Sequence, residues 1–594
     1  MSHGIPPRYS IGLWLAAGSL AFLLCLYHLS ATLADGAFLP ADHDSFYHAR
    51  RIIDSIAAPL RMYQFDPRIH APEGSWVTWP WGYDTLMAFA AGALMAATGA
   101  SDPMSVLAFV APAWAFVNAA LFLCVASRLQ LSLPAQTLAM LFFAASPLTQ
   151  SLHRVGTIDH HYVEYTFVLA TLSFGLAWFR DLAVRRHAIA LGVVLGAAPA
   201  FHNGLFALQV PLLAALGCLW MLQRPLEPRA VLAFAVALVA ATAAFLLPSE
   251  PFRLGAFSYY LHSWFHLYVA GCTAALCVLA SRFRAAPLSA SLIGAAALAM
   301  AAPIVAQVVL GSAFIFGTLE YLAAIDELRS IPRAIAEGRL QSLTNRYSAL
   351  LWLLPAGIGW LCWRLRRQAD GASIYFLAMA AFGSFLLLQQ YRLEYFGSFA
   401  LILPACVLFD DLRRAPATPR SRAWSIGLAA LIVAALLPGL RTLREAIPLG
   451  SDLQYVLTRP VYPALKGACA ANPGVVLAEH GDGHYIRFHS ECSVIANNFI
   501  LTPQHVQKVR QSEELLAGSL TEVLALAPYV RYVYVRRADN VLDDVRGCGV
   551  ACPENRGLRF ELLSTDSTPA RLRLLMEVRL PDSQPLGRLF EVIP

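Results

Sequence analysis

Long apolar stretches alternate with short polar segments from Ile11 to about Leu440. Most are roughly 17 to 25 residues long, the length that an α-helix needs to cross a hydrocarbon core of about 30 Å. After this point such stretches are absent, and short runs that alternate with period two, such as residues 531–536, indicate strands. We therefore predict a polytopic α-helical membrane domain over residues 1–440 and a mixed α/β domain over residues 441–594.

Arginines recur in every second short loop, which indicates the cytoplasmic side of a membrane protein. They fall on one side only if Tyr83–Thr98 is an interfacial or re-entrant helix within a first external loop, residues 34–103. The pattern then predicts about thirteen spans and a second long external loop, residues 317–345. In a bacterium this places the N-terminus in the cytoplasm and the C-terminal domain in the periplasm, with the chain in the inner membrane. The expected spans cover residues 11–33, 104–125, 134–150, 162–180, 187–200, 204–222, 230–247, 263–281, 289–316, 346–364, 371–390, 393–410 and 422–440.

Composition supports this class. The 594 residues are 58% hydrophobic and only 14% charged, whereas soluble proteins carry about 25% charged residues. The formal net charge of +6 is small and dispersed, so nucleic acid is not an expected partner. An ordinary soluble enzyme is excluded.

Four of the eleven cysteines lie in the expected periplasmic domain. An even number in an oxidising compartment permits two disulfides, whose pairing the sequence leaves open. A zinc site is the competing interpretation, although the spacing fits no common template. These cysteines are Cys469, Cys492, Cys548 and Cys552.

A polar motif precedes an expected span and carries the strongest chemical signal. It reads Arg154-Val-Gly-Thr-Ile-Asp-His-His-Tyr-Val-Glu164. Acidic and histidine side chains at such a position mark a functional cavity more often than not. Asp159 and His161 can converge on one cation, and oxygen with imidazole ligands suits Mn²⁺ or Mg²⁺. The alternative is a helix N-cap followed by a packed histidine pair.

Two further external segments carry chemistry. Asp42 and Asp44 open an amphipathic helix just after the first span, where either one alone could be a helix N-cap. Arg392 lies between two apolar spans, where it either snorkels or pairs with a phosphate. Acidic metal ligands and an anion-binding arginine at one membrane face fit a lipid-linked phosphate or pyrophosphate substrate, because a divalent cation would neutralise the leaving group.

The second long external loop adds charge whose role the sequence leaves open. Most of this charge is expected to form a solvated face, and one carboxylate could reach back to the site. The charged residues are Glu320, Asp326, Glu327, Arg329 and Arg333.

Together these motifs resemble the catalytic subunit of the oligosaccharyltransferase family, within the GT-C glycosyltransferases, and in particular its archaeal and bacterial single-subunit members. The segments Asp42-His-Asp-Ser-Phe-Tyr-His, Pro72-Glu-Gly and Trp79-Pro-Trp-Gly are similar to the first acidic motif and the stretch that follows it. The Asp-His-His motif matches the second acidic motif in its archaeal form. Ala324-Ile-Asp-Glu is similar to the motif that supplies a loop carboxylate.

The resemblance implies specific roles. Asp44, Asp159 and His161 would bind the cation, and His160 and Arg392 would contact the donor phosphate. Asp44 and a carboxylate that closes over the site would position the acceptor nucleophile. That carboxylate would be Glu327.

The C-terminal domain departs from the family pattern. Family members read the acceptor hydroxyl with a Trp-Trp-Asp-Tyr-Gly motif, whereas this chain has Glu479-His-Gly-Asp-Gly-His-Tyr-Ile and lacks both tryptophans. The flanks still match, so Glu479, Asp482 and His484 become the candidate acceptor-binding residues.

The motifs and the resemblance thus predict a metal-dependent, inverting glycosyltransferase that takes its glycan from a polyprenyl-(pyro)phosphate donor. The chain could act as a single subunit, and the sequence leaves open whether other subunits are needed. Transfer to protein asparagine is the first expectation for the acceptor. Modification of a surface polysaccharide or lipid is the alternative. A transporter of lipid-linked sugars would place charges in the middle of spans and contain repeats, and the sequence shows neither feature.

Overall fold

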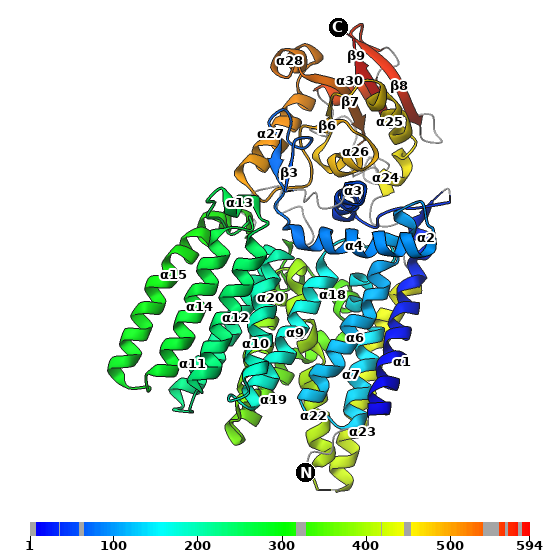
Figure 1. Cartoon of the computed structure of the whole chain (residues 1–594). Helices are drawn as coiled ribbons and strands as arrows, with labels where there is room; N and C mark the ends of the chain where they lie inside the picture. Colours follow the sequence, from blue (N-terminus) through cyan, green and yellow to red (C-terminus); the bar gives the residue numbers. More distant parts are fainter. Residues whose placement is uncertain are drawn as a thin grey trace.

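The computed structural model has three layers (Figure 1). A bundle of long helices is covered at one end by two helices that run across it, and a sheet-containing C-terminal domain lies on top of these. The structure describes residues 7–34, 36–58, 64–315, 328–416, 418–444, 453–537, 557–564, 568–579 and 585–593.

Each expected span contains at least one helix, so the polytopic helical class is confirmed. Within the described residues, eight helices are long and apolar enough to cross a membrane, or nine if the bent pair Leu340–Tyr347 and Ala349–Arg367 is one span. The other expected spans coincide with shorter helices, and the count of thirteen crossings stays a prediction. The main helices are α1 (Pro7–Cys25), α6 (Val110–Arg128), α7 (Leu133–Ala145), α9 (His161–Arg180), α10 (Arg185–Ala197), α11 (Gln209–Met221), α12 (Pro228–Leu246), α14 (Trp264–Arg282), α15 (Pro287–Ile315), α19 (Leu354–Arg367), α20 (Gly371–Gln389), α22 (Leu403–Arg414) and α23 (Pro419–Arg444).

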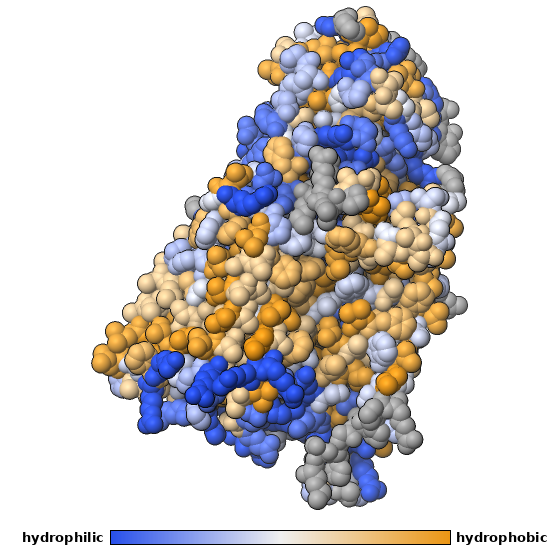
Figure 2. Space-filling model, in the orientation of Figure 1, coloured by the Kyte–Doolittle hydropathy of each residue, from blue (hydrophilic) through white to orange (hydrophobic). Residues whose placement is uncertain are grey.

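Hydrophilic residues gather at the end of the bundle away from the C-terminal domain (Figure 2). Helix α1 begins at this end (Figure 1). Arg180 donates a hydrogen bond to the carbonyl of Arg128 here, and Arg414 donates one to the carbonyl of Gln130. The arginines of the expected inner loops therefore share one end of the molecule, although which compartment this end faces stays a prediction.

Helix α4 (Trp81–Thr98) runs across the upper ends of the bundle helices (Figure 1). This is the course expected of an apolar helix that does not cross the membrane. Its first turn lies close against the bundle, because a Cβ on Gly82 would come within 2.5 Å of the carbonyl oxygen of Ala200. Helix α3 (His43–Ala57) lies between α4 and the C-terminal domain.

The C-terminal domain is built on a five-stranded mixed sheet with strand order β6-β5-β7-β9-β8. The central strand β7 contains the period-two run that the sequence indicated, and it is buried on both faces. Tyr532 and Tyr534 pack into the core that faces α3, whereas Val533 and Val535 pack into a second core. The elements are α25 (Val461–Ala471), β5 (Val475–Leu477), α26 (Gly483–His489), β6 (Ser493–Val494), α27 (Pro503–Ala517), α28 (Leu520–Leu526), β7 (Val530–Arg536), α30 (Gly557–Ser564), β8 (Leu572–Arg579) and β9 (Pro585–Val592).

One disulfide joins two of the four candidate cysteines. Cys469 on α25 is bonded to Cys492, which immediately precedes β6. These two cysteines are thus paired in the structure, while Cys548 and Cys552 lie outside the described residues.

A buried ion pair fastens the C-terminal domain to the first external loop. The Arg487 side chain of α26 is 2% exposed, and its Nε donates to Asp66 Oδ2 at 3.1 Å. Its Nη2 lies 3.4 Å from Asp54 on α3, and Tyr47 also donates to Asp66 at 2.9 Å. Breaking one partner of such a pair leaves an uncompensated buried charge.

We therefore expect Asp66→Ala to lower the free energy of unfolding by about 3 kcal/mol, because it leaves the Arg487 guanidinium buried with much weaker compensation. Thermal unfolding of purified protein in detergent measures the effect. Exposed Arg573 on the edge strand β8, which pairs with Glu591 on the neighbouring strand β9, gives the matched control Arg573→Ala. Equal melting temperatures for Asp66→Ala and the control would contradict the assignment.

Candidate functional site

The Asp-His-His motif lies where the bundle meets α3. Asp159 and His160 immediately precede α9, and His161 is its first residue. The backbone N–H of Ile158 donates to Ser45 Oγ at 2.9 Å. This bond joins the two acidic segments that the sequence singled out, which are more than 100 residues apart.

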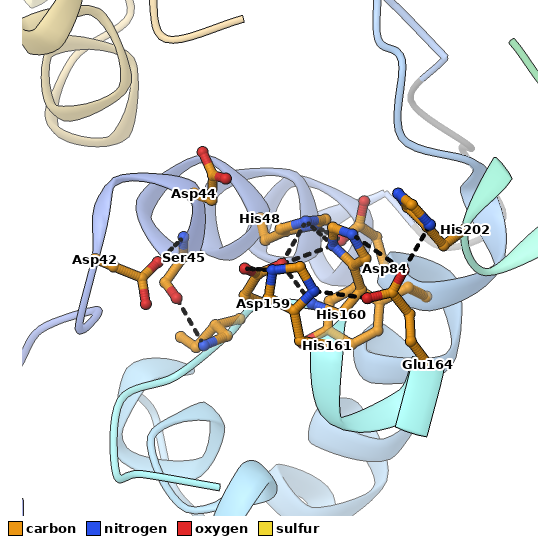
Figure 3. A network of polar contacts seen from close by, with 12 residues as sticks. Asp42, Asp44, Ser45, His48, Asp84, Asp159, His160, His161, Glu164 and His202 are labelled. Carbon is orange, nitrogen blue, oxygen red and sulfur yellow. Dashed lines mark hydrogen bonds and ion pairs between the residues drawn. The ribbon is translucent and has the colours of Figure 1, made fainter. Parts of the chain in front are cut away.

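Asp159 is 6% exposed and lies between imidazole rings. Its Oδ1 accepts from the His160 backbone N–H at 2.6 Å and lies 2.6 Å from His160 Nδ1. Its Oδ2 lies 3.1 Å from His161 Nε2. On the Oδ1 side, His48 Nε2 lies 3.7 Å away. Figure 3 shows these side chains converging from α3 and the start of α9.

Glu164 holds the other nitrogen of His161. This fully buried carboxylate accepts from His161 Nδ1 at 2.6 Å and from the Tyr395 hydroxyl at 2.8 Å. His202 Nδ1 lies 2.5 Å from its other side. Since a carboxylate only accepts, His161 carries its proton on Nδ1. In the neutral ring, the lone pair of Nε2 then faces the Oδ2 of Asp159.

His48 is held in the same way by a different carboxylate. Its Nδ1 donates to Asp84 Oδ1 at 2.6 Å, and Arg51 pairs with the second oxygen of Asp84 at 2.5 Å. The ring of His48 is stacked on Trp79 with centroids 4.0 Å apart. The Nε2 of His48 faces His160 Nδ1 at 3.0 Å.

Burial and charge set the ionisation of this cluster. Burial would raise the pKa of Asp159, but His161 and His160 outweigh it and hold that pKa well below its usual range. Burial likewise opposes ionisation of Asp84, yet Arg51 and His48 lower its pKa. Burial lowers the pKa of His160 to about 4. The cluster therefore combines ionised carboxylates with a neutral imidazole, which is the form that binds metals.

The cluster fits a divalent cation. Two groups among the described residues bring ligand atoms within 4.8 Å of one another, namely His48 with Asp159 and His160, and His160 with Glu164 and His202. Either a proton on His161 Nε2 or a cation lies between this nitrogen and Asp159 Oδ2, which are 3.1 Å apart. A lone pair facing a carboxylate oxygen is repulsive unless a proton or a cation lies between them.

Arg392 lies at the same end of the bundle, in a short turn ahead of Tyr395. The side chain is half-buried. Within the described part of the chain its guanidinium makes no hydrogen bond or ion pair. A partly buried guanidinium in this condition favours binding of an anion.

The first external segment is only partly as expected. Asp42 is the N-cap of α3 and accepts from the Ser45 backbone N–H at 2.8 Å. Asp44 projects from α3 away from the cluster in Figure 3, and its carboxylate is 39% exposed and 3.7 Å from His484 Nδ1. The structure therefore brings Asp159 and His161 together and leaves Asp44 outside this group.

The acceptor candidates of the C-terminal domain are divided. His484 is buried and lies against α3, where its Nδ1 is 3.1 Å from the His43 carbonyl. Asp482 accepts with both oxygens from Arg536 Nε at 2.8 Å, and Glu479 pairs with Arg559. These two carboxylates are thus engaged inside their own domain.

Glu327 lies outside the described residues, so its role stays a prediction. The segment that follows it is described, and the carbonyl of Arg329 accepts from the Tyr391 backbone N–H at 3.1 Å. Arg329 and Arg333 both pair with Glu337, as expected of a solvated face.

Sequence reasoning missed four residues of the site. His48 was part of the quoted first motif but received no role, and Asp84 lay in the predicted interfacial helix. His202 lies between the expected spans 187–200 and 204–222, in a loop that the arginine pattern assigns to the external side. A polar residue between two spans on that side could have been predicted to belong to the site. Tyr395 carried no such signal, because a tyrosine in a span usually packs.

Several solved structures of one archaeal enzyme have the same fold. The oligosaccharyltransferase AglB from Archaeoglobus fulgidus, in complex with an inhibitory peptide and a dolichol-phosphate, matches 96% of this chain and 80% of its own at 17% identity and a TM-score of 0.74. A structure of the Archaeoglobus fulgidus oligosaccharyltransferase tethered to an acceptor peptide with an NVT sequon matches the same shares at 17% identity and a TM-score of 0.71. The chain has the oligosaccharyltransferase fold.

This fold confirms the architecture that the motifs implied. A third structure of the Archaeoglobus fulgidus oligosaccharyltransferase, in complex with zinc and sulfate, matches 95% of this chain and 79% of its own at 17% identity and a TM-score of 0.68. No protein-family profile matches the chain, and no curated protein matches it by sequence.

Buried histidines between the first external loop and the C-terminal domain make stability depend on pH. His70 and His505 are fully buried and stacked with centroids 4.6 Å apart. Burial lowers the pKa of His70 to about 4 and that of His505 well below its usual range. Below about pH 6.5 the unfolded chain therefore binds more protons than the folded one, and stability falls as pH falls.

We expect each of these histidines to cost up to about 1.4 kcal/mol of unfolding free energy per pH unit between pH 6.5 and 5. Unfolding followed by tryptophan fluorescence at several pH values measures the slope. His505→Gln should reduce the slope relative to the unchanged protein. A slope of zero, or one unaffected by His505→Gln, would argue against this origin.

Proposed function

We propose that this chain is a glycosyltransferase of the inner membrane that transfers a glycan from a polyprenyl-(pyro)phosphate donor to an acceptor at the periplasmic face. The observation that carries the proposal is the position of the Asp159 cluster. It lies at the end of the bundle below the C-terminal domain, together with the half-buried guanidinium of Arg392, which has no hydrogen-bond or ion-pair partner among the described residues.

Asp159 and His161 would hold the divalent cation, Mn²⁺ or Mg²⁺. Ligands at about 2.1 Å from one ion and at right angles to each other are about 3.0 Å apart, which matches the 3.1 Å between Asp159 Oδ2 and His161 Nε2. Glu164 orients His161 by accepting from its Nδ1, as carboxylates do for metal-binding histidines. When bound, the cation would neutralise negative charge that develops on the departing phosphate.

Arg392 and His160 would bind the donor phosphate. Tyr395 connects the two halves of the site, because its hydroxyl donates to Glu164 and its ring stacks on His161 with centroids 5.6 Å apart. Arg392 lies in the short turn that immediately precedes the segment of Tyr395. A phosphate bound by Arg392 would thus lie next to the cluster.

Asp44 and Glu327 would position the acceptor nucleophile. The exposed carboxylate of Asp44 faces the C-terminal domain through His484, so it is accessible to a group held between the two domains. The described segment after Glu327 is attached beside Arg392 by the bond from Tyr391 to Arg329.

Protein asparagine is the first choice of acceptor, and the structural relative bound to an NVT peptide motivates it. A surface polysaccharide or lipid is the second choice, and the C-terminal domain favours considering it. Asp482, a carboxylate of the altered motif, accepts hydrogen bonds from Arg536 with both of its oxygens. It would have to give up this buried pair to read an acceptor hydroxyl.

The proposal predicts Mn²⁺-dependent transfer by the purified single chain. Lipid-linked oligosaccharide is incubated with an Asn-x-Thr peptide or a glycolipid acceptor, and mass spectrometry detects the product. Asp159→Ala and His161→Ala should each lower the turnover roughly a hundredfold or more, because a transition-state interaction is lost. His187→Ala, at the start of α10 on the far end of the bundle, is the matched control. Transfer that is full in both site variants, or absent with every acceptor, would refute the proposal.

Arg392 should act on donor binding. Arg392→Ala should weaken donor affinity about tenfold to a hundredfold, since a hydrogen bond to a charged group contributes about 1.5–3 kcal/mol. Arg392→Lys should recover only part of this, because lysine lacks the bidentate geometry. Binding of a short polyprenyl phosphate to each variant gives the measurement. Unchanged affinity in Arg392→Ala would assign the phosphate to another residue.

A further inference from the structure

Two carboxylate–histidine pairs flank Asp159 from opposite sides. On one side Glu164 accepts from His161 Nδ1 at 2.6 Å, and His161 Nε2 faces Asp159 Oδ2. On the other side Asp84 accepts from His48 Nδ1, also at 2.6 Å, and His48 Nε2 faces Asp159 Oδ1. Both imidazoles thus have their proton fixed on the far nitrogen and their other nitrogen turned toward the same carboxylate.

The second pair is built from three separate parts of the first external loop. His48 and Arg51 come from α3, Asp84 from the first turn of α4, and Trp79 from the segment between these helices. The His48 ring is 1% exposed and lies against the Trp79 ring at an interplanar angle of 15°. Arg51 compensates the charge of Asp84 at 2.5 Å. The ring is therefore fixed in position, in tautomer and in orientation.

The distances around His48 Nε2 suit a metal ion. His48 Nε2, His160 Nδ1 and Asp159 Oδ1 are separated by 3.0, 2.6 and 3.7 Å. Ligands about 2.1 Å from one ion are about 3.0 to 3.4 Å apart in octahedral or tetrahedral geometry. The separation of 3.0 Å lies in this range, whereas that of 2.6 Å is shorter and that of 3.7 Å is longer. Asp44, by contrast, projects away from Asp159 (Figure 3).

We propose that His48, rather than Asp44, is the ligand that the first external loop contributes to the cation at Asp159, and that Asp84 is its positioning residue. This inference rests on the proposed function only for the presence of a cation. It leaves Asp44 to the acceptor. It also gives His160 a defined tautomer, because metal binding at Nδ1 puts the proton on Nε2, where it can be donated to an oxygen.

Asp84 would not bind the cation itself, and its carboxylate would act by orienting His48. Removing a carboxylate that orients a metal-binding histidine typically weakens metal affinity 10- to 100-fold. Asp84→Asn keeps an acceptor oxygen of the same shape but loses the charge that Arg51 and His48 share, so it should reduce Mn²⁺ affinity with little change of packing.

The test is Mn²⁺ binding by the full chain in detergent, measured by calorimetry without donor or acceptor. We expect His48→Ala and Asp84→Asn each to weaken the affinity at least about tenfold. Asp44→Ala should stay within about twofold of the unchanged protein while losing transfer, and His187→Ala should change neither property. Affinity within twofold for both His48→Ala and Asp84→Asn, or a tenfold loss in Asp44→Ala, would overturn the proposal.

Pulsed electron paramagnetic resonance keeps the test decisive if His48→Ala does not fold. The Mn²⁺ complex of the unchanged protein should show coupling to more imidazole nitrogens than that of the conservative variant His48→Gln. Equal nitrogen coupling in the two proteins would overturn the assignment. Because binding is measured without substrates, intact Mn²⁺ binding without any glycan transfer would refute the proposed function and leave this ligand assignment standing.

Discussion

A carboxylate can accept hydrogen bonds but cannot donate them, and this constraint orders the whole site. Glu164 and Asp84 are buried, and each accepts a hydrogen bond from the imidazole that touches it. The Nε2 atoms of His161 and His48 then lie 3.1 Å and 3.7 Å from the oxygens of Asp159, a third buried carboxylate. Buried ionised groups are costly unless they are paired. We therefore interpret these three carboxylates and their imidazoles as the proposed binding site for a cation.

The rest of the architecture holds the residues around Asp159 in position at the end of the bundle that is expected to lie at the membrane surface. Helix α9 carries Glu164 and His161 one turn apart, so the bundle itself sets their geometry. Helices α3 and α4 run across the bundle end and bring His48 and Asp84 to it (Figure 1). The C-terminal domain is fastened above them by the Arg487–Asp66 pair. This layering places the polar residues of the site at the end of the bundle next to the C-terminal domain, which is where the proposed lipid-linked phosphate would bind.

Local features of the chain could be predicted from the sequence. The spans followed from the hydropathy pattern, and the course of α4 followed from the parity of the arginines. Asp159 and His161 could be paired because they are two residues apart in a motif that enters a span. Each of these inferences uses neighbours in the sequence, and physical chemistry acts on such neighbours directly.

Long-range partners could not be predicted in the same way. The sequence around His48 does not show that Asp84 accepts a hydrogen bond from it. The two residues are 36 positions apart, and they meet only when α3 packs on α4. The engagement of Asp482 with Arg536 depends on the register of β7 in the sheet. In the sequence, either Asp42 or Asp44 could be the helix N-cap. In the structure Asp42 caps α3, whereas the Asp44 side chain is exposed.

The central claim is that a divalent cation binds at Asp159, at the same end of the bundle as Arg392. Anomalous X-ray diffraction at the manganese absorption edge, from crystals grown with Mn²⁺, tests it most directly. The account predicts one strong anomalous peak within bonding distance of Asp159 and an adjacent imidazole nitrogen. A peak that lies elsewhere, or no peak at saturating Mn²⁺, would contradict it.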